Sequence, residues 1–186
     1  MEITQELLHE LMPRATDKNI ARFYQPLINA MKEFEINTPL RVAAFLAQIA
    51  HESDNLYYVE EIADGSAYEY RKDLGNLEYE ALQYAHQNNS TTGKWFKGHG
   101  LIQLTGYYNH KAISKALNID CLSNPKLLCE SEYASRSAAW FWNTHNCNSL
   151  ADVGLFGKIT RVINGGTDGI TERLKNYANC KKVLEC

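Results

Sequence analysis

The chain has 186 residues, enough for one domain with a substantial core, and hydrophobic residues make up 45% of it. The net charge of −3 excludes a general attraction to nucleic acid or to an anionic membrane surface. The N-terminal residues contain no basic start followed by an apolar core, and no apolar run approaches the ~20 residues of a membrane span. We therefore expect a single domain over residues 1–186, made in a cytoplasm, with no secretory signal and no membrane insertion.

Helical patterns dominate the first fifty residues. Apolar residues recur at helical spacing over residues 3–12 and over residues 17–35, where Pro26 predicts a kink or a split. A third helix begins near Pro39, which suits a first helical turn, and extends to about residue 53. Its many alanines allow close packing by neighbours, so we expect it to be the central core helix.

The middle of the chain is less regular. Residues 54–77 are predicted to form a loop, residues 78–88 a short helix, and residues 88–100 a polar, glycine-containing loop. The apolar run 101–105 permits a short strand or an extended segment. Helical patterns return over residues 108–118, 130–145, 149–163 and 169–184. The predicted fold class is mostly α, with little or no β-structure and a substrate cleft walled by the irregular segments.

Cysteines stand at positions 121, 129, 147, 180 and 186. An odd count without a C-x-x-C pair gives little support to a disulfide framework or a metal centre. We interpret them as buried or incidental thiols in a reduced compartment, and we predict no metal and no cofactor.

Two acidic positions frame the end of the central helix. Glu52 ends an apolar helix, which makes a half-buried carboxylic acid, and Glu60-Glu61 offers it a partner. Two carboxylates in different surroundings are what the cleavage of a glycosidic bond requires, with ~5–9.5 Å between them. Glu52 and Glu61 are nine residues apart, which means ~13 Å and opposite faces along one helix, or up to ~30 Å in an extended chain. The helix must therefore end near Ser53–Asn55, where turn-forming residues let the chain fold back.

An extended chain from residue 57 to residue 61 would place Glu60 and Glu61 on opposite sides. Parity alone leaves open which of the two faces the cleft.

The segment 98–109 joins three glycines to neutral polar and aromatic side chains. Glycines let a ligand approach the backbone closely. The amides of Gln103 and Asn109, the hydroxyl of Thr105 and the ring of Tyr108 suit sugar rings, which have polar edges and apolar faces. A purely structural turn explains this segment alone about equally well. Further along, Asn164 precedes a Gly-Gly break, where it can bind a ligand or cap a helix.

Five segments in order resemble the catalytic domain of glycoside hydrolase family 19, which includes plant-type chitinases and many phage endolysins. They are Phe-Leu-Ala-Gln-Ile-Ala-His-Glu-Ser (45–53), Gly-x-Gly-Leu-Ile-Gln-Leu-Thr-Gly-x-x-Asn (98–109), Asn-Pro-x-Leu-Leu (124–128), Ala-Ala-Trp-Phe-Trp (138–142), and Ile-Asn-Gly-Gly (163–166) with Arg173. The resemblance implies a lysozyme-like helical fold. It also implies an inverting mechanism with Glu52 as general acid, Glu61 rather than Glu60 as base, and Thr105 holding the attacking water. The residues that it implies for substrate binding or for tuning the carboxylates are His51, Ser66, Gln103, Tyr108, Asn109, Asn164, Arg161 and Arg173.

One residue and one short segment depart from the family pattern. Residue 99 is His where the family usually has Arg, so a weaker, pH-dependent cation replaces a fixed positive charge in that loop. After Glu61 the chain reads Ile-Ala-Asp-Gly-Ser (62–66) instead of the Asn-Leu-Asn-Tyr-Ser common in the endolysins, although Ser66 keeps its place.

The short interval between the two acids leaves no room for the long cysteine-bearing loop of plant chitinases. We therefore expect a monomeric, muramidase-type endolysin that acts on peptidoglycan glycan strands in the periplasm. A holin or a secretion system would move it from the host bacterial cytoplasm to the wall.

Other functions stay open. A chitinase would use the same catalytic residues, and a toxin delivered between bacteria would use the same chemistry. A lytic transglycosylase needs only one glutamate, so it would tolerate Glu61→Gln and release 1,6-anhydro products. A zinc amidase is disfavoured because position 55 is Asn, which leaves H-E-x-x-H incomplete. A glycan-binding module without activity would not need two carboxylates.

Overall fold

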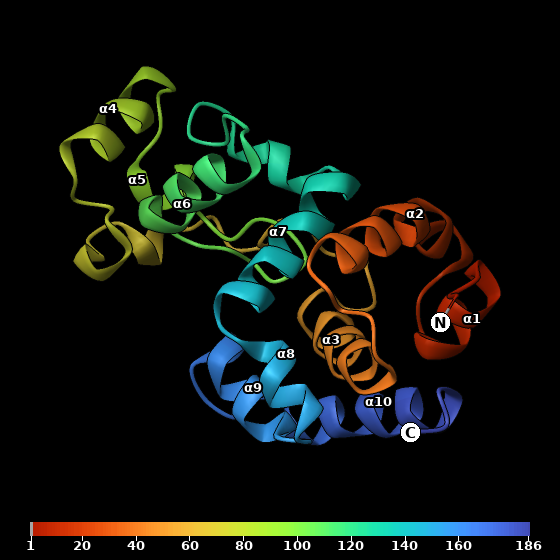
Figure 1. Cartoon of the computed structure of the whole chain (residues 1–186). Helices are drawn as coiled ribbons and strands as arrows, with labels where there is room; N and C mark the ends of the chain where they lie inside the picture. Colours follow the sequence, from red (N-terminus) through yellow and green to blue (C-terminus); the bar gives the residue numbers. More distant parts are fainter. Residues whose placement is uncertain (1) are drawn as a thin grey trace. The chain divides into compact units, whose positions relative to one another are not determined.

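The computed structural model describes residues 2–186, and helices dominate this part of the chain (Figure 1). The α-helices are α1 (Gln5–Leu11), α2 (Asp17–Glu33), α3 (Pro39–Glu52), α4 (Tyr79–Gln87), α5 (Thr92–Trp95), α6 (Tyr107–Leu117), α7 (Ser131–Thr144), α8 (Cys147–Asp152), α9 (Phe156–Asn164) and α10 (Ile170–Val183). Short 3₁₀ helices are η1 (Ser66–Tyr68), η2 (Lys72–Leu74) and η3 (Pro125–Cys129). Isolated bridges pair His99 with Glu60 and with Leu104. The predicted mostly α fold class is confirmed.

The chain divides into two compact units, and the division falls inside α7. The first unit contains residues 1–57 and 138–186, and the second contains residues 58–137. The single catalytic domain expected over the whole chain stays a prediction. Within residues 2–186, no helix is both long enough and apolar enough to cross a bilayer.

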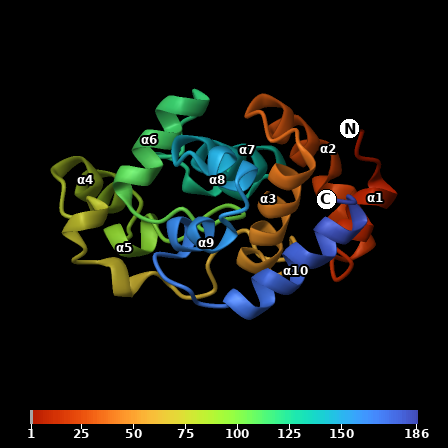
Figure 2. The ribbon, with the colours of Figure 1, turned by 60° about the horizontal axis from the view of Figure 1, so that its bottom comes forward.

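In the first unit, α3 is the central helix. Thr38 accepts a hydrogen bond from the Arg41 amide and Pro39 occupies the first turn, which together define where the helix begins. Every residue from Val42 to Ala50 is buried. Small side chains on this helix let α10 pack closely against it, and both views show the two helices next to each other (Figures 1 and 2). The predicted core helix is therefore the element on which this unit is built.

The second unit holds α4, α5 and α6 with long irregular connections. Its core contains Ala81, Phe96 and Tyr107, and Trp95 and Leu122 pack at the edge. The rings of Phe96 and Tyr107 meet edge to face with centroids 5.6 Å apart. This cluster anchors the start of α6, which directly follows the glycine-rich segment.

Four predictions of local structure can be compared with what is observed. Helix α2 continues through Pro26, because the buried side chains of Phe23, Leu27 and Met31 hold it against its neighbours on both sides of the proline, so of the predicted kink or split the split does not occur. The loop predicted over residues 88–100 contains α5, which at four residues is too short to show a period.

Residues 149–163 form two helices instead of one. Gly154 adopts a left-handed φ of 70° and its amide donates to Ala151, which ends α8 before α9 begins. The run 101–105 forms a tight turn rather than a strand. His99 and Leu104 exchange two backbone hydrogen bonds of 2.9 and 3.1 Å around it.

Candidate active site

Helix α3 ends at Glu52 with a hydrogen-bonded cap. The Asn55 amide donates to the Ala50 carbonyl at 2.8 Å and the Asp54 amide to the His51 carbonyl at 3.4 Å, the pattern of a Schellman motif. Asp54, Asn55 and Leu56 have φ values of 45°, 58° and 67°, so the chain leaves the helix through three successive left-handed residues. The break predicted near Ser53–Asn55 is confirmed.

A buried polar network holds the Glu52 side chain. Arg173 on α10, which is 1% exposed, donates from Nη2 to Glu52 Oε1 at 2.5 Å and from Nη1 to Gln48 Oε1 at 2.6 Å. Gln48 in turn donates to Thr160 Oγ1 at 2.8 Å. The Glu52 side chain is 16% exposed. One carboxylate oxygen is therefore fixed from inside the unit, while part of the group remains accessible.

His51 lies on the neighbouring face and contacts α10. Its Nδ1 is 3.0 Å from Glu172 Oε2, and Arg14 contacts the other oxygen of the same carboxylate at 2.5 Å. A Cβ on Gly169 would lie 2.2 Å from the His51 ring, so this glycine lets the histidine pack against the backbone. These contacts are structural, and the substrate-binding role of His51 stays a prediction.

The two other residues predicted in the first unit lie on the surface. Asn164 ends α9, is exposed, and accepts a hydrogen bond from the Asp168 amide at 3.3 Å. Arg161 is exposed on the same helix. Of the two arginines expected to tune the carboxylates, the structure brings Arg173 to Glu52.

In the second unit, both carboxylate oxygens of Glu61 accept hydrogen bonds. The Tyr68 hydroxyl donates to Oε1 at 2.9 Å and the Gly98 amide donates to Oε2 at 2.9 Å. A Cβ on Gly98 would lie 2.8 Å from Gln103 Oε1 and 3.1 Å from Glu61 Oε2. Glycine at position 98 therefore lets Gln103 and Glu61 lie next to each other.

Glu60 has different partners. Lys97 Nζ lies 2.9 Å from Glu60 Oε1, and Lys126 Nζ lies 3.8 Å from Oε2. Burial raises the pKa of Glu60, but the hydrogen bond and charge of Lys97 and the charge of Lys126 outweigh it, so the pKa is lowered. Lys97 also donates to the main-chain oxygen of Glu61 at 3.0 Å. Glu60 is thus an ion-paired carboxylate, whereas Glu61 is held by neutral donors.

The predicted sugar-binding segment is linked by hydrogen bonds along the chain. The Gln103 amide donates to the Gly100 carbonyl, Thr105 donates to the Gln103 carbonyl at 2.9 Å, and Asn109 donates to the Thr105 carbonyl at 2.8 Å. Gln103 has a φ of 55°, a conformation unusual for a residue with a side chain. Gln103 and Thr105 are thus joined in one local network, and Gln103 Oε1 and Glu61 Oε2 both approach Gly98.

Tyr108 and Ser66 lie at the edges of this region. The Tyr108 ring is 46% exposed, packs on Gly75 and donates to Glu78 at 2.5 Å. Ser66 is exposed at the start of η1, where its amide donates to Asp64 at 2.9 Å. Neither side chain has a contact with Glu61 that would assign it a role, so both stay predictions.

His99, which departs from the family pattern, is buried against His110. The two ring nitrogens are 3.1 Å apart, and His110 Nδ1 lies 2.8 Å from the Gly106 carbonyl. Because the carbonyl can only accept, His110 carries its proton on Nδ1, and its Nε2 accepts from His99. Burial lowers the pKa of His99 to about 4 and that of His110 to about 3. The pair is neutral at pH 7 and supplies no fixed positive charge.

Three residues of these networks were not predicted from the sequence. Gln48 gave a weak signal, as a single amide inside an apolar helix, which must find a partner when buried. Tyr68 and Asn76, a buried side chain that donates to the Tyr68 carbonyl at 2.7 Å, lie in the segment predicted as loop, where no period marks a side chain as buried or exposed. Only the fold shows their partners.

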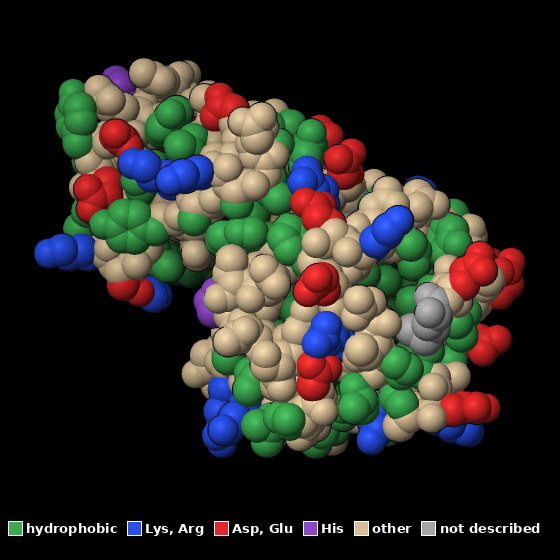
Figure 3. Space-filling model, viewed as in Figure 1, with side chains coloured by type: hydrophobic (Ala, Val, Ile, Leu, Met, Phe, Trp, Pro, Cys, Tyr) green, Lys and Arg blue, Asp and Glu red, His purple; other side chains and the backbone are tan. Residues whose placement is uncertain are grey.

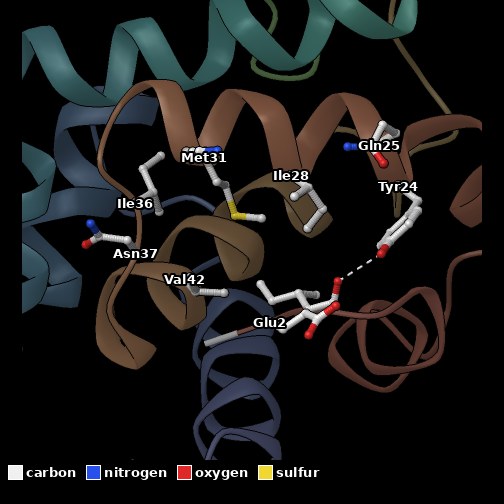
Figure 4. A pocket seen from close by; sticks show the side chains of 10 residues that line it. Glu2, Tyr24, Gln25, Ile28, Met31, Ile36, Asn37 and Val42 are labelled. Atoms are coloured by element: carbon white, nitrogen blue, oxygen red, sulfur yellow. Dashed lines mark hydrogen bonds between the residues drawn. The ribbon is translucent and has the colours of Figure 1, made fainter.

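One pocket of the first unit is lined largely by apolar side chains. It has a volume of about 510 Å³ and is lined by α2, the start of α3 and the N-terminal segment. Figure 4 shows Ile28, Met31 and Val42 facing it, with the Tyr24 hydroxyl donating to the backbone of Ile3. None of the predicted catalytic residues lines it.

Charged side chains are interspersed on the face shown in Figure 3, with no extended field of one sign. Within residues 2–186, no three His, Cys, Asp or Glu side chains are grouped so that they could hold a metal ion.

Comparison with known proteins places most of the chain in one family. The profile described as chitinase class I, glycoside hydrolase family 19, matches residues 24–155. Endochitinase At2g43620 of Arabidopsis thaliana is 39% identical over 126 residues, covering 67% of this chain and 39% of that protein. A glycosyl hydrolase family 19 domain-containing protein of Haemophilus influenzae is 27% identical over 197 residues, covering 95% of this chain and 94% of that protein. The chain thus spans less than half the length of the Arabidopsis endochitinase, but nearly all of the bacterial relative.

Two solved structures superpose on almost the whole chain. Chitinase C from Streptomyces griseus superposes with a TM-score of 0.75 at 23% identity, covering 98% of this chain and 76% of that one. A bacterial family 19 chitinase superposes with a TM-score of 0.70 at 26% identity, covering 98% of this chain and 94% of that one.

Proposed function

Because the chain belongs to glycoside hydrolase family 19, the class I chitinases, we propose that it hydrolyses β-1,4 bonds between amino sugars. The observation that carries this proposal is that the carboxylates of Glu52 and Glu61 differ in their hydrogen-bond partners. Glu52 is mostly buried and held through one oxygen by Arg173, whereas Glu61 accepts two hydrogen bonds from neutral donors. Two carboxylates with different surroundings can divide the roles of acid and base between them.

In this mechanism Glu52 protonates the glycosidic oxygen through the carboxylate oxygen that Arg173 does not occupy. Glu61 takes a proton from the water that attacks the anomeric carbon. Because the water attacks from the face opposite the leaving oxygen, the anomeric centre is inverted. The Thr105 hydroxyl donates its proton to the Gln103 carbonyl, so its oxygen lone pairs remain to accept a hydrogen of that water. Gln103 and Asn109 would bind the sugar, together with Tyr108 and Asn164 from their exposed positions.

We infer that the substrate is peptidoglycan and that the protein is an endolysin. The interval of nine residues between Glu52 and Glu61 supports this, because it leaves a compact site without a long insertion. The match to a bacterial relative over nearly its whole length also favours a bacterial setting. In this proposal the enzyme is a monomer, is made in the host cytoplasm, and reaches the periplasmic wall through a holin or a secretion system.

Chitin is the second candidate substrate. The names of the plant relatives and of the solved structures, all chitinases or endochitinases, favour it. Chitin and the peptidoglycan backbone share the β-1,4 amino-sugar linkage, so one pair of carboxylates serves for both.

Turbidity of permeabilised Gram-negative cells tests the proposal. We expect lysis by the wild type, none by Glu52→Gln, and normal lysis by Glu10→Gln, which changes an exposed carboxylate on α1. Equal lysis by wild type and Glu52→Gln would remove the role given to Glu52. Mass spectrometry of the products, from peptidoglycan and from chitin oligosaccharides, then identifies the substrate. Reducing ends support hydrolysis, and 1,6-anhydro ends would show a lytic transglycosylase instead.

A further inference from the structure

Tyr68 contacts the carboxylate of Glu61 from a position that the family motifs do not mark. Its hydroxyl donates to Glu61 Oε1 at 2.9 Å. Burial raises the pKa of Tyr68, and the hydrogen bond to Glu61 raises it further, so the hydroxyl keeps its proton over the range in which a glycosidase works. It therefore acts only as a donor toward this oxygen.

The backbone around Tyr68 is fixed on both sides. Tyr68 ends η1, and its amide donates to the Gly65 carbonyl at 3.0 Å. Its own carbonyl accepts from the Asn76 side chain at 2.7 Å. Asn76 is fully buried, and its other amide atom accepts from the Tyr107 amide at 3.1 Å. A single asparagine thus joins the segment of Tyr68 to the first residue of α6.

Gly65 lets this segment approach α5. Gly65 has a φ of 86°, and a Cβ there would lie 2.4 Å from the Gly93 carbonyl oxygen. A Cβ on Gly93 would lie 2.5 Å from the Gly65 carbonyl oxygen. No side chain fits between the two backbones, so the segment that carries Tyr68 lies directly against α5.

We propose that Tyr68 is a positioning residue for the catalytic base Glu61, an inference that rests on the proposed function. With Tyr68 on Oε1 and the Gly98 amide on Oε2, the carboxylate cannot rotate without losing both hydrogen bonds. Each oxygen retains a lone pair that can take the proton of the attacking water. A base held in this way is ready for the reaction before the substrate binds.

Two cations lie near this pair of side chains. The charge of Arg71 lowers the pKa of Tyr68, against the larger effect of burial, and Arg71 is itself paired with Asp73 at 2.6 Å. Lys97 contacts Glu61 through the main-chain oxygen. Neither supplies a hydrogen bond to the Glu61 carboxylate, so the phenol is the side chain whose removal should affect the base directly.

Kinetics of Tyr68→Phe in the full chain test this role. We expect kcat to fall by about ten-fold while KM changes by less than about two-fold, because the lost hydroxyl is bonded to the base Glu61. The acidic limb of the pH profile of kcat should move to higher pH, since the ionised base has lost a donor. Tyr70→Phe is the matched control, because Tyr70 is 85% exposed in the same segment. It should leave both constants and the profile unchanged.

A second variant separates the hydrogen bond from the packing of the ring. With 3-fluorotyrosine at position 68 the ring and the donor remain, and kcat should stay within about two-fold of wild type. A wild-type enzyme inactive on both peptidoglycan and chitin oligosaccharides would overturn the proposed function. An active wild type together with an unchanged kcat in Tyr68→Phe would overturn the role of Tyr68 alone. A fall in kcat of the same size with 3-fluorotyrosine would also overturn it, because the donor is then present.

Discussion

Arg173 donates a hydrogen bond of 2.5 Å to Glu52, and the guanidinium that does so is 1% exposed. The same guanidinium contacts Gln48 at 2.6 Å and the Asp168 carbonyl at 3.0 Å. A buried charge is tolerated only when its hydrogen bonds are satisfied, and here three acceptors satisfy it. Glu52 is therefore part of the interior of its unit as well as a candidate acid, so its environment can be tested by stability as well as by activity.

Arg173→Lys should lower the free energy of unfolding by about 2–4 kcal/mol, because one ammonium cannot reproduce the planar set of hydrogen bonds. We also expect kcat to fall by on the order of ten-fold, because Glu52 loses its orientation. Urea denaturation measures the first effect. Arg161→Lys is the stability control, since Arg161 is exposed on α9 and should cost less than about 0.5 kcal/mol. Equal unfolding midpoints for the two variants would contradict the buried network.

Gly98→Ala should reduce activity on the order of 100-fold, because a Cβ 2.8 Å from Gln103 Oε1 must displace either Gln103 or Glu61. The free energy of unfolding should fall by about 1–3 kcal/mol from the same crowding. Gly157→Ala is the control, because its Cβ would meet nothing within 4 Å. Alanine there should keep the free energy of unfolding or raise it by up to about 1 kcal/mol. Full activity in Gly98→Ala would show that this turn can accommodate a Cβ, contrary to the structure.

The buried pair His99 and His110 should make the protein sensitive to acid before its carboxylates titrate. Their folded pKa values, about 4 and about 3, lie below the ordinary value of 6.5. Below pH 6.5 the unfolded chain therefore binds more protons than the folded one, and stability falls as the pH falls. We expect the free energy of unfolding to decrease between pH 6.5 and pH 5 with a slope that approaches two protons.

His99→Gln should halve that slope, because one of the two neutral imidazoles is removed. His86→Gln, which changes an exposed histidine on α4, should leave the slope as it is in the wild type. Urea titrations at several pH values measure both. A slope unaffected by His99→Gln would mean that other groups take up the protons.

Local patterns predicted most helices because α2, α3, α4, α6, α7 and α10 each carry several apolar residues at helical spacing. The break after Glu52 was predictable from turn-forming residues and from the distance two carboxylates require. The sequence could not show α5, because it has too few residues for a period. Nor could it show that α8 ends just before Gly154. It also could not show Tyr68 or Asn76, because their partners are set by how the irregular segments fold.

The assignment of the base to Glu61 rather than Glu60 had only a family resemblance behind it at the level of sequence. Parity predicted opposite sides for the two residues, and the partners of their two carboxylates are indeed separate. Glu61 contacts Tyr68 and the Gly98 amide, and Glu60 contacts two lysines. A carboxylate that already pairs with Lys97 and Lys126 is a poor base, because taking a proton would break those ion pairs.

Glu61→Gln should therefore reduce kcat by about 10²–10⁴-fold, the range expected when a general base is lost. Glu60→Gln should keep kcat within about ten-fold of wild type. It removes the ion pair with Lys97 but leaves the Glu61 carboxylate and its two donors in place. Single-turnover rates with both variants, on whichever glycan the wild type cleaves, measure the difference. If Glu60→Gln abolished cleavage and Glu61→Gln did not, the base would be Glu60. If Glu61→Gln kept full activity and released 1,6-anhydro ends, the enzyme would need only Glu52, as a lytic transglycosylase does.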